Sequence, residues 1–409
     1  MNHIIQFFGI SLLATALTAC GGGGSGKHKS SSSASSRAPS SSALSSIAPS
    51  STAASSTPTS SSVAASLSVA LKTLTTIPIG VAVSATTESY NIFDSTAQQR
   101  VVTHHFNQLT AGNIMKMSYL HPLENSFTYT NADALIDFAS DNGMSVHGHA
   151  LIWHSDYQVP SWMKNYVGDK TVWLAMLENH VKTITAYYSG KVVSWDVVNE
   201  AINDDGSYRN SIFFQKTDDD YIEQAFINAH EGDPIADLYY NDYSIEVDPE
   251  KMATLKTMLD DFIARDVPID GVGFQMHIYM DYPSIATIKA AFQEIVVRDL
   301  KVKITELDIP INNPYSSGYP GNVKTTLTTE LALAQKKRYC EVVAAYLETV
   351  PTNLRGGVTI WGVNDPSSWL ISFLFDDEHD DWPLLFNANY NEKPALQGVA
   401  DALSNQPCN

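Results

Sequence analysis

The sequence has 409 residues, of which 44% are hydrophobic and 17% are charged, and its formal net charge at pH 7 is −19. A chain this acidic is not expected to bind nucleic acid or an anionic lipid surface, so its charge favours a neutral partner. The length is sufficient for one large folded domain with a substantial core.

The N-terminal residues have the features of an export signal. Residues 1–19 contain an apolar core that is too short to span a bilayer, which is typical of a secretory signal peptide. The sequence Leu17-Thr18-Ala19-Cys20 resembles a bacterial lipobox, in which the cysteine is lipidated and becomes the new N-terminus. Position 21 is Gly rather than the Asp associated with inner-membrane retention. We therefore predict a protein held by a lipid on Cys20 at the outer membrane or cell surface; a secreted or periplasmic protein is the alternative.

A low-complexity segment separates this signal from the rest of the chain. Residues 20–66 consist mainly of Gly, Ser, Ala, Thr and Pro, with few large apolar side chains. Such a segment cannot bury enough surface to offset the entropy lost on ordering, so it is predicted to be a flexible linker. Because residues 1–66 contain three basic residues and no acidic one, residues 67–409 carry a net charge of −22 and form the predicted folded domain.

In residues 67–409, short apolar runs typical of strands alternate with amphipathic segments of helical length. The expected strands cover residues 77–84, 113–119, 145–153, 192–200, 236–241, 271–278, 302–309 and 357–363. The expected helices cover residues 95–109, 132–142, 171–188, 221–230, 249–265, 285–297, 330–347 and 394–403. Eight strand–helix pairs predict a single (β/α)8 TIM barrel, and a doubly wound open sheet is the alternative.

Unusual polar residues gather at the ends of these apolar runs, where a parallel barrel places its active site. Glu200 and Glu306 are the most informative, because a buried carboxylate costs several kcal/mol unless it is paired or protonated. Two carboxylates facing each other across a barrel mouth are what glycoside hydrolysis requires: one attacks, and the other, protonated because of its neighbour's charge, donates to the leaving oxygen. The alternative is that both form buried ion pairs with barrel cations such as Lys116.

Six motifs, in the right order, resemble those of family 10 glycoside hydrolases, the endo-β-1,4-xylanases. The similarity extends over roughly residues 67–405, including a closing segment at 384–394. The motifs are Gly148–His154 (GHALIWH), Trp195–Ala201 (WDVVNEA), Tyr240–Tyr243 (YNDY), Gly273–His277 (GFQMH), Ile304–Asp308 (ITELD) and Trp361–Asp365 (WGVND).

The resemblance implies a role for each matching residue. Glu200 would be the general acid/base and Glu306 the nucleophile of a retaining mechanism, with carboxyl groups roughly 5–5.5 Å apart. Asn199 would bind the 2-hydroxyl of the sugar under attack, and His277 would orient the nucleophile. The residues expected to line the sugar site are Asn113, Lys116, His149, Trp153, Gln275, Trp361 and Trp369. The implied substrates are xylan and arabinoxylan, with no cofactor, no metal and a monomeric enzyme.

Two positions depart from the family pattern. The family usually has a sugar-binding glutamate where this chain has Gly112, and an arginine where it has Leu370. These departures predict a second glycone subsite that is wider and less polar than usual, and that tolerates arabinose side chains.

Several alternatives remain open on the residues alone. His147 and His149 point to the same side of a strand, a spacing that also occurs in metal-dependent hydrolases. Related β-1,4-glucanases and mannanases use the same Asn-Glu and Glu, and a barrel that only binds glycan needs neither acid nor nucleophile. Cys340 and Cys408 form either a disulfide, which export permits, or two buried free thiols.

Overall fold

The computed structural model describes residues 67–86, 88–375 and 379–409; the predicted signal peptide, Cys20 and the linker lie outside them. Parallel strands form a closed barrel in sequence order, in which the first strand pairs with the eighth. The strands are β1 (Ile79–Val83), β2 (Gln108–Ala111), β3 (Ser145–Trp153), β4 (Ser194–Asn199), β5 (Asp237–Asp242), β6 (Gly271–Phe274), β7 (Lys301–Leu307) and β8 (Arg355–Ile360). The predicted (β/α)8 barrel is confirmed, and closure excludes the open sheet.

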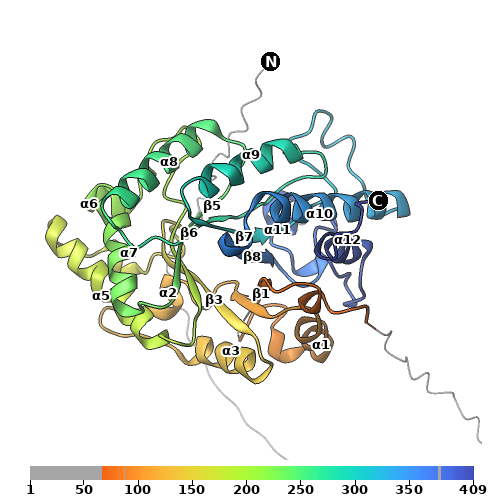
Figure 1. Cartoon of the computed structure of the whole chain (residues 1–409). Coiled ribbons are helices and arrows are strands. Elements are labelled where there is room, and N and C mark those ends of the chain that lie inside the picture. The colour runs from red at the N-terminus through yellow and green to blue at the C-terminus, as the bar shows by residue number, and fades with distance from the viewer. Residues whose placement is uncertain (1–66, 87, 376–378) are drawn as a thin grey trace, which may run out of the picture. The chain divides into compact units, whose positions relative to one another are not determined.

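The helices surround the barrel, and in Figure 1 the colours run around it in sequence order. The helices are α1 (Thr96–His105), α2 (Met117–Leu120), α3 (Thr130–Asp141), α4 (Ser161–Lys164), α5 (Lys170–Tyr188), α6 (Ile212–Thr217), α7 (Asp220–Gly232), α8 (Pro249–Ala264), α9 (Ile285–Val296), α10 (Thr329–Thr349), α11 (Leu370–Phe375) and α12 (Pro394–Leu403). Local sequence explains where many of them begin: at α8, the Asp248 side chain accepts hydrogen bonds from two backbone amides and Pro249 is the first helical residue. Within the described part of the chain, none of these helices has the length and apolar character needed to cross a membrane.

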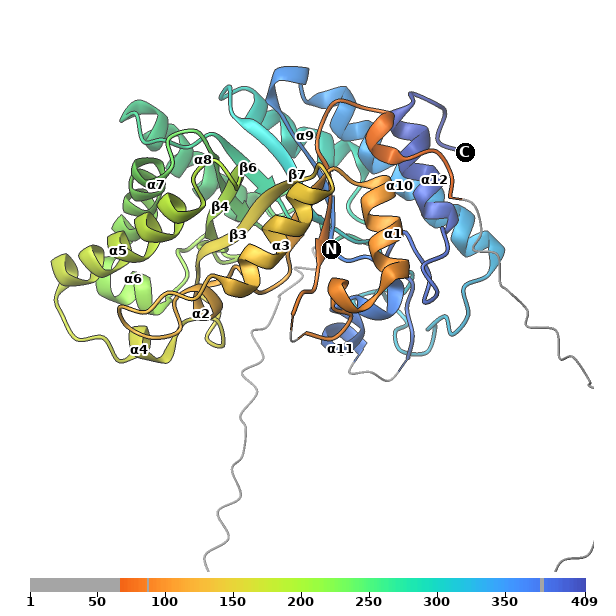
Figure 2. The ribbon, with the colours of Figure 1, turned by 90° about the horizontal axis from the view of Figure 1, so that it is seen from below.

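Short helices mark the face of the barrel where the strands end. The helices α2 and α4 follow strands β2 and β3 directly, α11 follows β8 after a 3-10 helix at Asp365–Ser367, and Figure 2 shows all three along the lower side of the molecule. Because parallel strands have all their carboxyl ends at one face, the residues that follow each strand meet there. This face therefore carries the candidate site.

The second strand lies earlier in the sequence than predicted. Helix α1 ends at His105 rather than Leu109, β2 begins at Gln108, and residues 113–116 form the turn that follows it. The polar residues of β2 obscured it, because Gln108 faces the barrel interior and accepts a hydrogen bond from Lys303 at 2.6 Å. The expected strands over 271–278 and 357–363 are also shorter, which leaves Gln275, His277 and Trp361 just beyond the ends of β6 and β8.

The glycine between the two histidines of β3 is required by close packing. The ring of Trp195 in β4 is fully buried against Gly148, and a Cβ added there would lie 2.1 Å from a ring carbon. Any larger residue would force the strands apart. Gly148 therefore lets β3 approach β4 closely, which places His147 and His149 beside the residues of β4.

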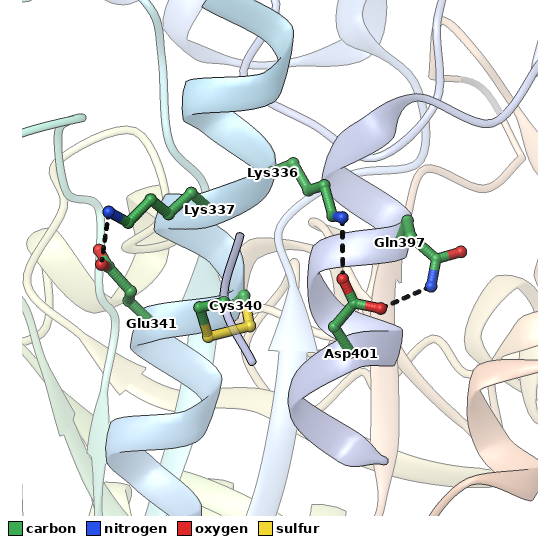
Figure 3. The surroundings of a disulfide bond; sticks show 7 residues. Lys336, Lys337, Cys340, Glu341, Gln397 and Asp401 are labelled. Atoms are coloured by element: carbon green, nitrogen blue, oxygen red, sulfur yellow. Dashed lines mark hydrogen bonds and ion pairs between the residues drawn. A yellow bond between two sulfur atoms is a disulfide. The ribbon is translucent and has the colours of Figure 1, made fainter. Parts of the chain in front are cut away.

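Cys340 and Cys408 form a disulfide, with their Cα atoms 5.4 Å apart. The bond attaches the C-terminal segment to α10, and next to it Lys336 of α10 pairs with Asp401 of α12 at 3.0 Å (Figure 3). Of the two states left open by the sequence, the structure has the disulfide.

Candidate active site

Glu200 and Glu306 lie at the carboxyl ends of β4 and β7. Glu306 is the penultimate residue of β7 and is 4% exposed, whereas Glu200 is the first residue after β4 and its side chain is 14% exposed. Glu200 has a backbone φ of 59°, a left-handed conformation that is uncommon for a residue with a side chain. Such strain is retained only where the surroundings hold it, and it often marks a functional site.

A chain of amide hydrogen bonds joins the two carboxylates. The register of β4 and β5 pairs Asn199 with Asn241, so their side chains lie next to each other. Asn241 Nδ2 donates to Glu306 Oε1 at 2.8 Å and to Asn199 Oδ1 at 2.9 Å. Asn199 Nδ2 donates in turn to Glu200 Oε1 at 3.2 Å. The positions of the two glutamates are therefore coupled through fixed side chains.

His277 lies between Glu306 and a second acid. Its Nε2 is 3.4 Å from Glu306 Oε2, and its Nδ1 is 3.0 Å from Asp308 Oδ2. Asp308 also accepts a hydrogen bond from Trp369 Nε1 at 2.9 Å, which fixes the acid that holds the histidine. Burial lowers the pKa of His277, but the two carboxylates outweigh burial and raise it to about 10. His277 is therefore an imidazolium at neutral pH and places a positive charge beside the Glu306 carboxyl group.

Glu200 has neutral hydrogen-bond donors instead. Trp153 Nε1 donates to Glu200 Oε2 at 3.0 Å, and Gln275 Nε2 donates to Glu200 Oε1 at 2.9 Å. Burial raises the pKa of Glu200, but the contributions of His154 and of these two donors outweigh burial and keep the pKa below its ordinary value. Since burial lowers the pKa of His154 to about 4, that ring is neutral at neutral pH, and the two hydrogen bonds remain.

The electrostatic surroundings of Glu200 differ from those that we expected from the sequence. We expected the charge of one glutamate to keep the other protonated. Instead, His154, the amide and indole donors and Arg209 together outweigh burial and keep the pKa of Glu200 below its ordinary value. Within the described residues, the basic side chains at ion-pair distance from Glu200 and Glu306 are His154, at 3.9 Å but neutral at neutral pH, and His277. These contacts therefore do not show the alternative, in which lysine or arginine residues form buried ion pairs with the two glutamates.

His149 is held by an acid inside the barrel. Asp196 Oδ2 lies 2.8 Å from His149 Nδ1 and 3.1 Å from His147 Nε2, so the two histidines share one carboxylate oxygen. The ring of Trp361 packs edge-on against His149, with ring centres 5.2 Å apart. Within the part of the chain that the structure describes, His, Cys, Asp and Glu residues do not form a group of three that could hold a metal ion.

Lys116 and Asn113 lie beside Trp153, after β2. Lys116 Nζ donates to Asn113 Oδ1 at 3.0 Å and lies 4.7 Å from the centre of the Trp153 ring. Asn113 Nδ2 donates in turn to Glu88 Oε1 at 2.5 Å. Burial lowers the pKa of Lys116 to about 8, although Glu306 and other nearby acids oppose this change. Glu88 therefore places a carboxylate next to Asn113.

Gly112 and Leu370, the two positions that depart from the family pattern, have different surroundings in the structure. A Cβ added to Gly112 would meet its nearest atom, Val83 O, at an ordinary contact distance of 3.5 Å, so a side chain would fit there. Leu370, in contrast, is 3% exposed, so its side chain packs inside the protein. Phe373, three residues further on, is 60% exposed, and its ring centre is 4.8 Å from that of Trp369.

The sequence matches the family model described as glycosyl hydrolase family 10 over residues 66–402. The chain belongs to glycosyl hydrolase family 10. Two relatives are the endo-beta-1,4-xylanase Xyn10C of Cellvibrio japonicus, 53% identical over 343 residues, and the endo-1,4-beta-xylanase A of Cellvibrio japonicus (strain Ueda107), 46% identical over 351 residues. The matches cover 81% and 82% of this chain but only 57% and 56% of the relatives, so the chain spans just over half of their length.

Solved family 10 structures have the same fold. Native xylanase 10C from Cellvibrio japonicus superposes with a TM-score of 0.81 and 52% identity, covering 83% of this chain and 74% of that one. A mutant of that xylanase in complex with xylopentaose matches with the same score and identity, over 83% of this chain and 70% of that one.

Several residues of this family 10 site were not singled out from the sequence as individual contacts. Asn241 belongs to the Tyr240–Tyr243 motif, and its position as a polar residue in a buried strand was the available signal. Asp308 and Asp196 carried a similar signal, as acids in apolar runs. Tyr157, 73% exposed and packed edge-on against Trp153 with ring centres 5.7 Å apart, gave none, because an exposed tyrosine in a loop is ordinary.

Proposed function

We propose that this chain is a retaining, endo-acting β-1,4-xylanase that hydrolyses internal bonds of xylan and arabinoxylan. The observation that carries the proposal is the unequal environment of two linked carboxylates. Glu306 lies beside an imidazolium, whereas Glu200 is held by the neutral donors of Trp153 and Gln275. A carboxylate oriented by a neighbouring imidazolium suits a nucleophile, and one held by neutral hydrogen-bond donors suits a group that gains and loses a proton.

The mechanism assigns one step to each group. Glu306 Oε2 or Oε1 attacks the anomeric carbon and forms a glycosyl ester, while protonated Glu200 donates its proton to the departing sugar oxygen. Glu200 then removes a proton from water, and the resulting hydroxide oxygen displaces Glu306 from the sugar. Asn241 and His277 keep the Glu306 carboxylate oriented through both steps. Asn199, which is hydrogen-bonded to Asn241 and to Glu200, is in place to bind the 2-hydroxyl of the sugar.

Leaving-group dependence tests these roles. Glu306→Ala is expected to abolish turnover of every substrate. Glu200→Ala is expected to form the glycosyl ester at nearly the wild-type rate from an aryl xylobioside whose phenolate leaves without a proton, and to lose at least ~10²-fold on xylan. An equal first-step loss with good and poor leaving groups would refute the assignment of Glu200. The anomer formed first, measured by NMR, would distinguish retention from inversion.

The names of the relatives support xylan over glucan or mannan as substrate. Digestion of xylan, mixed-linkage glucan and mannan by the purified chain tests this choice. Release of a ladder of xylo-oligosaccharides is expected from xylan, and faster hydrolysis of glucan or mannan would contradict the proposal. Binding of xylan without any product would instead support a glycan-binding protein.

Tolerance for arabinose side chains is a further part of the proposal. The space beside Gly112 supports it, because the family glutamate is missing there and Val83 O lies 3.5 Å from an added Cβ. Product analysis on arabinoxylan should give oligosaccharides with arabinose on the second glycone sugar. Products that are undecorated at that position would contradict this part alone.

Attachment through a lipid on Cys20 completes the proposal. Its support is the lipobox-like sequence Leu17–Cys20 and the linker composition of residues 20–66. Expression of the full chain in a Gram-negative host with labelled palmitate should label the protein. Cys20→Ala should remove the label and release the protein from the outer membrane fraction, and an unchanged distribution would contradict anchoring.

A further inference from the structure

The peptide that follows Glu200 is held from outside the active-site cleft. Ala201 N donates to Tyr240 Oη at 3.1 Å, and Tyr240 Oη donates to Asp242 Oδ2 at 2.5 Å. Asp242 Oδ1 lies 2.9 Å from Lys251 Nζ, on helix α8. A continuous path therefore runs from a helix of the outer layer to the backbone of the residue next to Glu200.

Strand alternation explains why this path is separate from the sugar site. In β5, Tyr240 and Asp242 point to one side of the strand and Asn241 points to the other. Asn241 faces the cleft, where it binds Glu306. The other two face the helices, where Lys251 meets them. One strand thus contributes to both carboxylates, on opposite faces.

The ion pair in this path is completely buried. The side chains of Lys251 and Asp242 both have 0% exposure. Lys251 Nζ is also 3.5 Å from the centre of the Tyr243 ring and 3.5 Å from Asp204 Oδ1, in the loop after β4. A buried ion pair is weak evidence for stability, because desolvation offsets most of the attraction. Its role is better explained by the geometry that it fixes.

That geometry is the left-handed backbone of Glu200. Its φ of 59° is unfavourable for a residue with a Cβ, so neighbouring contacts must hold it. Arg209 Nε donates to the Glu200 carbonyl oxygen at 2.9 Å, and Arg209 Nη2 donates to Tyr243 Oη at 3.0 Å. Together with the Tyr240 contact at Ala201 N, these bonds hold the peptide group between Glu200 and Ala201 at both its oxygen and its nitrogen.

We propose that Lys251, Asp242 and Tyr240 are positioning residues for Glu200, holding the strained backbone that aims its carboxyl group at the leaving oxygen. The inference rests on the proposed acid/base role of Glu200. None of the three side chains needs to touch the sugar. Loss of the path should therefore impair proton donation selectively and leave attack by Glu306 nearly intact.

Tyr240→Phe is the sharpest test, because it removes only the hydroxyl that connects Asp242 to Ala201 N. We would compare kcat/KM of the full chain on two aryl β-xylobiosides, one whose leaving group requires protonation and one whose leaving group does not. The expected loss is at least ~10-fold on the first and less than ~3-fold on the second. Tyr239→Phe, at a buried tyrosine of the same strand, is the matched control and should not change the ratio between the two substrates.

Lys251→Met tests the far end of the path, and Lys256→Met, on the same helix but in a surface pair with Glu294 at 3.3 Å, is its control. Lys251→Met should change the substrate ratio in the same direction as Tyr240→Phe. The double variant should change it no further than the larger single effect, because both act through one path. If Lys251→Met does not fold, as judged by near-UV circular dichroism, the substrate ratio of Tyr240→Phe still tests the positioning role.

The outcomes separate this inference from the proposed function. Suppose that Glu200→Ala shows the leaving-group dependence, but Tyr240→Phe lowers kcat/KM equally on both substrates or on neither. The positioning role is then overturned and the acid role stands. If Glu200→Ala itself lowers kcat/KM equally on the two substrates, the acid role fails and the positioning role fails with it. A selective loss in both variants supports both.

Discussion

The hydrogen bond from Trp153 to Glu200 predicts a measurable change in the pH profile. Trp153→Phe keeps an aromatic ring but removes the N–H that donates to Glu200 Oε2 at 3.0 Å. This donor stabilises the carboxylate more than the carboxylic acid. Its removal should therefore raise the pKa of Glu200, so that the proton donor stays protonated to higher pH.

The size of the change follows from the energy of the bond. A hydrogen bond to a charged group contributes about 1.5–3 kcal/mol, and a neutral acceptor retains about half of that. The difference between the two protonation states is then about 0.8–1.5 kcal/mol, and one pKa unit corresponds to about 1.4 kcal/mol. We expect the pKa of Glu200 to rise by about 0.5–1 unit. The donor from Gln275 remains and limits the change.

The assay is the pH dependence of kcat/KM on xylotetraose, whose alkaline limb reports the acid group of the free enzyme. That limb should move to higher pH by about 0.5–1 unit in Trp153→Phe. The matched control is Trp369→Phe, because the Trp369 indole donates to Asp308 rather than to Glu200. Its alkaline limb should stay in place. A limb in Trp153→Phe that does not move, or that moves to lower pH, would refute the reasoning.

Three further predictions concern other parts of the molecule. Gly112→Glu should fold normally, because the added Cβ has room, and should raise the ratio of kcat/KM on linear xylan to that on arabinoxylan. Cys408→Ser should lower the free energy of unfolding, measured in urea, by about 2–4 kcal/mol, because it opens a link between residues 68 positions apart. The folded pKa of His277, about 10, lies above its unfolded value, so its stabilisation is complete below about pH 6.5 and is lost as the pH rises toward 10. The difference in unfolding free energy between wild type and His277→Gln should therefore shrink across that interval, and a difference that grows would contradict the sign.

The sequence by itself determined the fold class and the pair of glutamates. Alternating strand and helix periods leave few architectures, and burial makes a carboxylate in an apolar run so costly that Glu200 and Glu306 stand out. The second strand was misplaced, because Gln108 gives β2 a polar character that only its contact with Lys303 inside the barrel explains. Local pattern does not reveal which partner a buried polar residue will meet.

Protonation and positioning were decided only by the tertiary structure. The pKa of Glu200 depends on donors from β3 and from the residue after β6, which are far from it in sequence. Leu370 is buried and Glu88 reaches Asn113 because of how the segments after β8 and β1 pack, and neither contact follows from the residue type. The path from Lys251 to Ala201 exists because β5 lies between the cleft and α8 in the closed barrel. Electrostatic and hydrogen-bond effects depend on distances of a few ångströms between residues that only the completed fold brings together.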